Sequence, residues 1–184
     1  MAYVSGGNEL LDAWKILRRL GVKTGSRVAD FGCGGAGHFI IPAAQLAGAE
    51  TTVFAVDILK SALSTVSTKA MAEGIYNIKT VWSNIEIVGA TNIKAGSLDF
   101  VLLVNNLFQS KEYENILKEA WRLLRHGGRL LVVDWSDQPT PFGPAMVDRV
   151  KEEEVQALVE KLNLKLIDHF QAGTYHYGQI YEKS

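Results

Sequence analysis

The sequence predicts an α/β fold: a doubly wound, mostly parallel sheet of seven strands, with helices on both faces and an antiparallel hairpin at the C-terminus. Three segments are apolar on both faces, as strands are in the middle of a helix-covered parallel sheet: Thr51–Asp57, Leu98–Asn105 and Arg129–Trp135. Helical patterns alternate with these strands, which predicts right-handed βαβ units. The last two strands are joined only by Ala172-Gly173-Thr174, so they must be antiparallel.

The first elements have recognisable boundaries. A helix capped by Asn8 and closed by Gly21 is expected within residues 1–21, where it covers the sheet. Its inward stripe consists of Leu10, Ala13, Trp14 and Leu17. Arg27–Phe31 is a strand that leads into a glycine-rich loop. The next helix is expected to start near Phe39–Ile41, because Pro42 is tolerated only in a first turn.

The remaining elements keep the alternation. One helix is striped by Leu59, Leu63, Val66 and Ala70, and another by Tyr113, Ile116, Leu117, Ala120 and Leu124, ending at Gly127-Gly128. Ile78–Ser83 is a strand between them. Lys151–Leu162 is a helix, and Leu164–Gln171 and Tyr175–Lys183 are the final strands. In the last strand His176 lies on the face opposite Tyr175, Tyr177 and Tyr181, and we expect this strand at the edge of the sheet.

Composition narrows the class of protein. The 184 residues, 47% hydrophobic and 21% charged, suit one globular domain over residues 1–184. A net charge of −1 gives no basic excess for nucleic acid or a membrane surface. Cys33 is the only cysteine, which excludes an intramolecular disulfide and a cysteine cluster for zinc. With no apolar run of about 18 residues and no leader pattern, we expect a cytoplasmic protein without a membrane role.

The loop after the first strand holds the main functional signal. Gly32-x-Gly34-x-x-Gly37 allows positive φ and close approach of a ligand to the backbone, although this pattern alone is weak and also serves strand–helix packing. Asp57 ends the second strand, where an acidic residue binds ribose hydroxyls in sheets of this kind. Asp30, just before the loop, would repel a pyrophosphate by a few kcal/mol, whereas it would attract a ligand with an ammonium and a sulfonium group. A nicotinamide dinucleotide stays open, but Asp30 favours the cationic ligand.

Four motifs in order carry a resemblance. "VADFGCG", "FAVD", "SLDFVLLVNNLF" and "EAWRLLRHGGRLLVVDW" resemble the class I S-adenosylmethionine-dependent methyltransferases, and more narrowly the small ubiquinone/menaquinone-biosynthesis methyltransferases. The resemblance implies a Rossmann-like fold, S-adenosylmethionine as methyl donor, S-adenosylhomocysteine as product and no metal. Ala36 occupies the family's third glycine position and Gly37 follows it, so this loop is one residue longer than the family pattern.

The resemblance also implies positions for the donor. The methionine part would face Asp30, the loop residues Gly32, Cys33, Gly34, Gly35 and Gly37, and Asn105 with Asn106. The ribose would face Asp57 with Ile58 beside it, and the adenine would face Ser83, Asn84 and Ile85. Asn84 stands where the family often has aspartate, and its amide can still accept a hydrogen bond from the adenine amino group.

The methyl acceptor is less defined. In-line displacement needs mainly alignment, and His38 and Asp134 are candidate bases for an acceptor that must lose a proton. The structural alternatives are a pocket-wall or capping histidine for His38 and a strand-end residue that bonds backbone N–H groups for Asp134. Phe108, Trp135 and Phe142 are candidates for a substrate pocket wall. "NNLF" differs from the Asn/Asp-Pro-Pro-aromatic sequence of amino-group methylation. We expect a small-molecule acceptor before a protein or RNA, and an unspecified oligomeric state. An NAD(P)-binding oxidoreductase-like domain and a non-catalytic S-adenosylmethionine- or nucleotide-binding protein are the alternatives.

Overall fold

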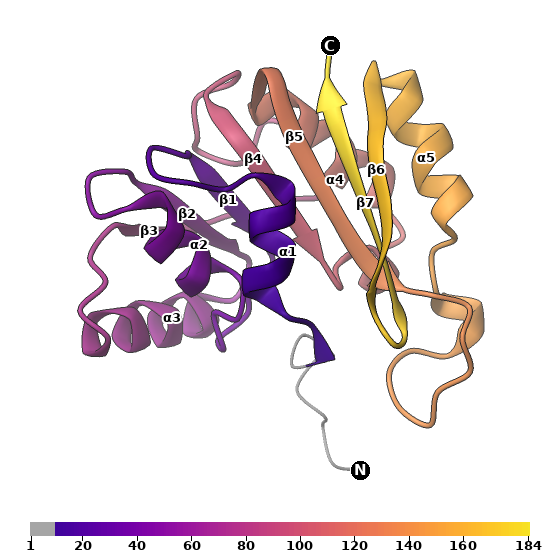
Figure 1. Cartoon of the computed structure of the whole chain (residues 1–184), viewed down its shortest axis with the longest axis horizontal. Coiled ribbons are helices and arrows are strands. Elements are labelled where there is room, and N and C mark those ends of the chain that lie inside the picture. The colour runs from indigo at the N-terminus through magenta and orange to yellow at the C-terminus, as the bar shows by residue number, and fades with distance from the viewer. Residues whose placement is uncertain (1–9) are drawn as a thin grey trace.

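A computed structural model describes residues 10–184, and its centre is one seven-stranded sheet (Figure 1). The strands are β1 Val28–Phe31, β2 Val53–Asp57, β3 Ile78–Trp82, β4 Leu98–Val104, β5 Leu124–Trp135, β6 Leu164–Gly173 and β7 His176–Lys183. Their order is β3-β2-β1-β4-β5-β7-β6. The first five strands are parallel, and β7 runs antiparallel to both β5 and β6.

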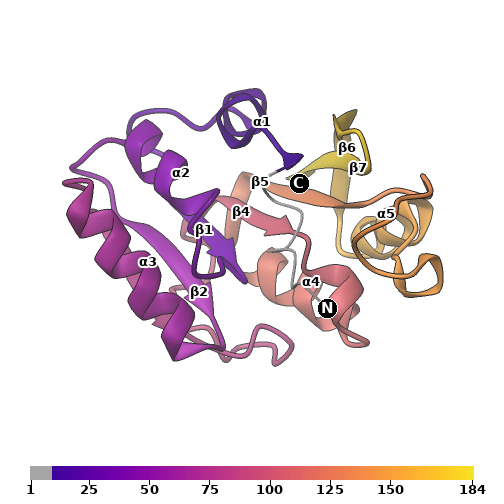
Figure 2. The same cartoon turned by 90° about the horizontal axis from the view of Figure 1, so that it is seen from below.

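Helices cover both faces of the sheet. They are α1 Ala13–Leu20, α2 Ile40–Ala47, α3 Lys60–Ala72, α4 Tyr113–Leu123 and α5 Glu152–Lys161, with short 3-10 turns η2 Leu107–Gln109 and η3 Met146–Asp148. Apolar residues of α1, α2 and α3 form one core with one face of the sheet, and those of α4 and α5 form a second core with the other. Figure 2 shows α1 and α2 on one side of the strands and α4 on the other. The predicted α/β fold with its antiparallel hairpin is confirmed.

The arrangement defines one edge for ligands. The chain leaves β1 toward β2 on one side, while β4 pairs with β1 on the other, so the switch point lies between β1 and β4. Trp135, at the end of β5, pairs with His176, at the start of β7. The turn between β6 and β7 therefore lies at the same edge as the carboxyl ends of the parallel strands (Figure 1).

The first helix differs from its prediction. The predicted cap, Asn8, lies outside the described residues; α1 begins at Ala13, capped by Asp12, whose Oδ1 accepts a hydrogen bond from the N–H of Lys15. The predicted inward residues Leu10 and Trp14 are 44% and 38% exposed. The later start shifts the buried stripe to Ala13, Ile16, Leu17 and Leu20. Gly21 closes the helix at φ 101°, as expected.

The predicted end of α4 is also wrong. The helix stops at Leu123, and Gly127-Gly128 lies within β5 instead of ending the helix. A Cβ on Gly128 would stand 2.9 Å from the carbonyl oxygens of both Arg125 and Leu98. This glycine is therefore needed for the close approach of β5 to β4, where the strand register shifts.

The predicted position of the last strand, at the edge of the sheet, is wrong as well. β7 lies between β5 and β6, and β6 forms the edge of the sheet. The two cores on the faces of the sheet take up the side chains of this internal strand, and Tyr177, Tyr181 and His176 are at most 3% exposed. Among residues 10–184 no helix is long and apolar enough to cross a membrane.

Candidate functional site

The glycine loop is attached to the end of β2. The N–H groups of Gly32 and Cys33 both donate to the carbonyl oxygen of Val56, at 2.8 and 3.1 Å. Gly32 has φ +64°, and a Cβ there would stand 2.1 Å from Nδ2 of Asn106. Glycine is required here on both counts, and it brings the loops after β1 and β4 together.

Gly34 is the open point of the loop. It has φ +60°, and a Cβ at this position would meet nothing within 4 Å. Its N–H donates to Oδ2 of Asp57 at 3.0 Å, and the N–H of Leu59 donates to Oδ1 of the same carboxylate at 2.8 Å. Asp57 is 8% exposed and holds the loop against the start of α3. Backbone and carboxylate thus border space into which a ligand can approach.

Asp30 is buried beside this loop, with 3% of its surface exposed. Burial, followed by the nearby charge of Asp57, raises the pKa of Asp30 to about 8, and a hydrogen bond from the N–H of Ile40 at the start of α2 opposes the shift. A buried carboxyl with so high a pKa lacks a positive partner. A cationic ligand would supply this missing partner.

His38 connects the glycine loop to the segment before α1. Its Nε2 lies 2.8 Å from the carbonyl oxygen of Leu11, and its ring packs edge-on against Phe39. On the other side of the loop, Nζ of Lys69 donates to the carbonyl oxygen of Ala36 at 2.9 Å. These contacts favour the structural alternative for His38 that the sequence left open.

The loop after β3 contains the predicted adenine side. Ser83 is buried, with Oγ 3.2 Å from Oγ1 of Thr91. Asn84 accepts a hydrogen bond from the N–H of Glu86 through Oδ1, so its amide nitrogen and the second lone pair of Oδ1 are left for a ligand. Ile85 is partly buried against the second core, and Ile58, across from it on the next strand end, is 54% exposed.

A buried ion pair that the sequence did not reveal anchors this loop. Glu119 of α4 is fully buried and accepts hydrogen bonds from the N–H groups of Gly89 and Thr91, at 2.7 and 3.0 Å. Arg122 donates to both Glu119 oxygens and to the carbonyl oxygen of Thr91. The only sequence signal was the i, i+3 spacing of the pair on a helix, which surface pairs share.

The end of β4 turns sharply at Asn105, which has φ 56° and donates its N–H to the carbonyl oxygen of Val133. Asn106 accepts a hydrogen bond from the N–H of Val104.

Asp134 is fully buried and accepts hydrogen bonds from the N–H groups of Leu107, Phe108 and Trp135. Burial raises the pKa of Asp134 to about 7 against those three bonds. Its carboxylate is occupied with holding the loop, which favours its structural alternative.

An aromatic cluster follows β5. The rings of Trp135 and Phe142 pack edge-on at 6.3 Å, and Phe142 packs on Tyr175 at 5.3 Å. His176 lies tilted against Trp135 at 4.3 Å. The structure therefore brings Trp135 and Phe142 together, whereas Phe108 stays on η2 and joins none of these ring contacts among residues 10–184.

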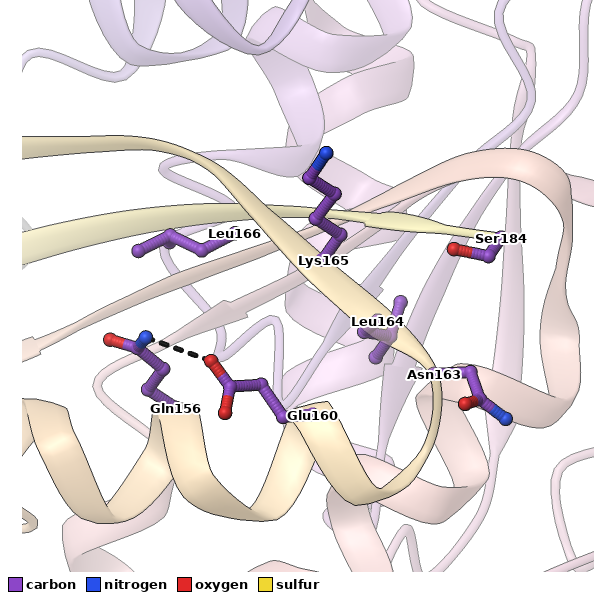
Figure 3. A pocket seen from close by; sticks show the side chains of 7 residues that line it. All are labelled: Gln156, Glu160, Asn163, Leu164, Lys165, Leu166 and Ser184. Atoms are coloured by element: carbon purple, nitrogen blue, oxygen red, sulfur yellow. Dashed lines mark hydrogen bonds between the residues drawn. The ribbon is translucent and has the colours of Figure 1, made fainter.

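Other features of the described chain lie apart from this edge. No group of three His, Cys, Asp or Glu residues among residues 10–184 could hold a metal ion. A groove of about 710 Å³ between α5 and β6 is lined by Gln156, Glu160, Asn163, Leu164, Lys165, Leu166 and Ser184 (Figure 3). Ser184 lies at the opposite edge of the sheet from the turn between β6 and β7 (Figure 1), so this groove is separate from the candidate site.

Comparisons with known proteins identify a sequence family and a fold. The sequence profile described as the ubiE/COQ5 methyltransferase family matches residues 7–146. The demethylmenaquinone methyltransferase of Geobacillus stearothermophilus is 30% identical over 129 residues, which make up 70% of this chain and 53% of that protein. The ubiquinone/menaquinone biosynthesis C-methyltransferase UbiE of Marinomonas sp. (strain MWYL1) is 31% identical over 134 residues, 72% of this chain and 52% of that protein.

The chain thus spans about half the length of the curated relatives it matches. The crystal structure of a SAM dependent methyltransferase from Aquifex aeolicus superposes with a TM-score of 0.86 at 21% identity, covering 97% of this chain and 93% of that one. This structural likeness supports the fold. The family match includes β1 to β5, whose carboxyl ends carry the glycine loop, Asp57 and Asp134.

Proposed function

The chain belongs to the ubiE/COQ5 methyltransferase family, and we propose that it transfers a methyl group from S-adenosylmethionine to a ring carbon of a small quinol. The single observation that carries the donor assignment is the buried, electrically uncompensated carboxyl of Asp30 beside the open backbone of Gly34. The names of the relatives, which include demethylmenaquinone and a C-methyltransferase, support the acceptor.

The donor-site residues fit S-adenosylmethionine as a group. We assign Asp30 and the loop from Gly32 to Gly37 to the cationic methionine end, and Asp57 to the ribose hydroxyls. When bound, the donor supplies a methyl group on a sulfonium, which needs no metal for displacement. A pyrophosphate in the same place would add negative charge beside the buried Asp30 and offer it no positive partner, whereas the ammonium and sulfonium of the methyl donor supply one. We therefore favour the methyl donor over NAD(P).

In this proposal the remaining residues bind the adenine or position the loops around the donor. We assign Asn84 to the adenine, where its amide nitrogen can donate to a ring nitrogen and the second lone pair of Oδ1 can accept from the amino group. Asp134 and His38 are bonded to backbone groups, and we assign them to positioning the loops after β4 and β1. Rate acceleration would come mainly from aligning the acceptor carbon with the methyl group. We expect a protein that works in the cytoplasm.

The test is transfer of label from methyl-tritiated S-adenosylmethionine to demethylmenaquinone that has been reduced to the quinol. We expect label in the methylated quinol, menaquinol, with the wild type, and a large loss with Asp57→Asn. Asp148→Asn, at an exposed aspartate in η3, is the matched control. Label in RNA or protein in place of the quinol would reassign the acceptor. Binding of donor without transfer to any of these pools would make the chain a non-catalytic binding protein.

A further inference from the structure

The start of β7 contains a buried histidine with unused hydrogen-bonding capacity. His176 is 1% exposed, and neither Nδ1 nor Nε2 has a hydrogen-bond partner among residues 10–184. The Nε1 of Trp135, whose side chain is 3% exposed and lies against the His176 ring, has none among these residues either. Most buried polar groups in native proteins are paired, and three unpaired atoms in one place call for a functional explanation.

This cluster lies at the edge of the sheet that carries the candidate site. Trp135 and His176 are directly opposite each other on β5 and β7, at the carboxyl edge of the parallel strands. Side chains alternate along strands, so both lie on the face of Val133 and Ile180, which pack in the core under α1 and α2. Asp30 faces the same side, toward the start of α2. β7 is two strands from β4, about 10 Å from Asn105 at the usual strand spacing.

The surroundings keep the imidazole neutral. Burial, and then the positive charge of Arg149, lowers the pKa of His176 to about 4. The guanidinium of Arg149 is itself bonded to the carbonyl oxygens of Ser136, Gln138 and Pro144, and it lies 5.7 Å from the centre of the Trp135 ring. A neutral imidazole offers one N–H donor and one acceptor nitrogen, and the indole offers a second donor.

We propose that His176 and Trp135 form the polar end of the methyl-acceptor site, where they bind a hydroxyl group of an aromatic acceptor. A hydroxyl can donate to the acceptor nitrogen of His176 and accept from Nε1–H of Trp135, whereas a quinone carbonyl can only accept. The edge-on rings of Phe142 and Tyr175 provide the apolar wall beside it. The site thus favours the reduced, hydroxyl-bearing form of the acceptor, because a carbonyl in the same place would leave the acceptor nitrogen of His176 unpaired. The reduced form is also the one with an electron-rich, nucleophilic ring.

This inference rests on the proposed function for the identity of the acceptor, but not for the two residues. The family match ends at residue 146, so His176 lies outside the part of the chain that the family describes. An apolar replacement of similar shape distinguishes a core histidine from a substrate-binding histidine by its effect on acceptor binding. Removal of two unpaired buried polar atoms should stabilise the fold in either case, but only the binding role loses function.

The experiment compares His176→Phe with His176→Gln and with His126→Phe, the same replacement at an exposed histidine. Binding of 1,4-dihydroxynaphthalene is measured by calorimetry in the presence of S-adenosylhomocysteine, beside kcat/KM for reduced demethylmenaquinone. We expect His176→Phe to melt at a higher temperature and to bind S-adenosylhomocysteine as the wild type does. It should lose about tenfold in both acceptor measurements, the effect of one or two neutral hydrogen bonds.

His176→Gln, which keeps a donor and an acceptor, should recover most of the loss, and His126→Phe should change neither measurement. Equal binding of the dihydroxynaphthalene by wild type and His176→Phe, or no binding by the wild type, would overturn the inference. Wild-type binding of the dihydroxynaphthalene without methyl transfer to the quinol would instead contradict the proposed function and leave the His176 site standing.

Discussion

Replacing Asp30 with asparagine should remove most of the pH dependence of S-adenosylmethionine binding. The carboxyl is buried and its pKa is raised to about 8, first by burial and then by the charge of Asp57. A neutral carboxyl cannot stabilise a cation, so the donor must bind to the ionised form. Binding then requires the release of a proton below pH 8.

The magnitude follows from the fraction of Asp30 that is ionised. With a pKa of about 8, roughly one tenth of the carboxyl is ionised at pH 7 and roughly one hundredth at pH 6. The Kd for S-adenosylmethionine should therefore rise about tenfold for each pH unit below 8, or about 1.4 kcal/mol per unit. The α-amino group of the ligand titrates near pH 8 as well, and Asp30→Asn reports that contribution alone.

Isothermal titration calorimetry in buffers of different ionisation enthalpy counts the protons. Between pH 6 and 7 the wild type should release about one more proton per donor bound than Asp30→Asn does. S-adenosylhomocysteine, which lacks the sulfonium charge, should show a smaller pH effect than S-adenosylmethionine. Equal proton release and parallel pH profiles for wild type and Asp30→Asn would refute the pairing of this carboxyl with the donor cation.

Three further predictions concern stability. Gly32→Ala should lower the free energy of unfolding by about 3 kcal/mol in urea denaturation, because alanine disfavours positive φ and its Cβ would clash with the loop after β4. Gly35→Ala, whose Cβ would make only ordinary contacts, should have a free energy of unfolding near that of the wild type. Glu119→Gln should lower the free energy of unfolding by about 2 kcal/mol and weaken S-adenosylhomocysteine binding, because it loosens the loop after β3. Glu114→Gln, in an exposed pair, should leave the free energy of unfolding near that of the wild type, and equal losses for the two variants would contradict the anchoring role. Because the folded-state pKa of Asp30 is raised, its protonation stabilises the fold fully near pH 4, and this stabilisation is lost by pH 8. The melting temperature of the wild type relative to that of Asp30→Asn should therefore fall from pH 4 to pH 8. A difference in melting temperature that stays constant over this interval would show that the pKa is not raised.

The sequence was most informative where strand ends meet loops. The alternation of apolar strands and helices predicted all seven strands, and Asp30, Asp57 and the glycines were located because glycine and carboxylate have few structural substitutes at such turns. The long-range partners were not visible. The bond from Gly34 to Asp57 and the burial of Gly32 under Asn106 depend on how the strands align, which no local pattern states.

The errors have physical causes of the same kind. Leu10 and Trp14 fit a helical stripe, but Asp12 starts the helix later and rotates them outward. His126-Gly127-Gly128 has the composition of a helix end, yet the close approach of β4 draws these glycines into β5. The alternating tyrosines near the C-terminus fit an edge strand as well as an internal one. The burial of His176 follows from the pairing of β7 with β5, which the local sequence does not show.

Thermal denaturation with and without S-adenosylhomocysteine or NAD tests the central claim most directly, that this edge of the sheet binds a methyl donor. S-adenosylhomocysteine at a hundred times its dissociation constant should add about 2.7 kcal/mol of stability and raise the melting temperature clearly, while NAD should not. Stabilisation by NAD, with no response to S-adenosylhomocysteine or S-adenosylmethionine, would contradict it.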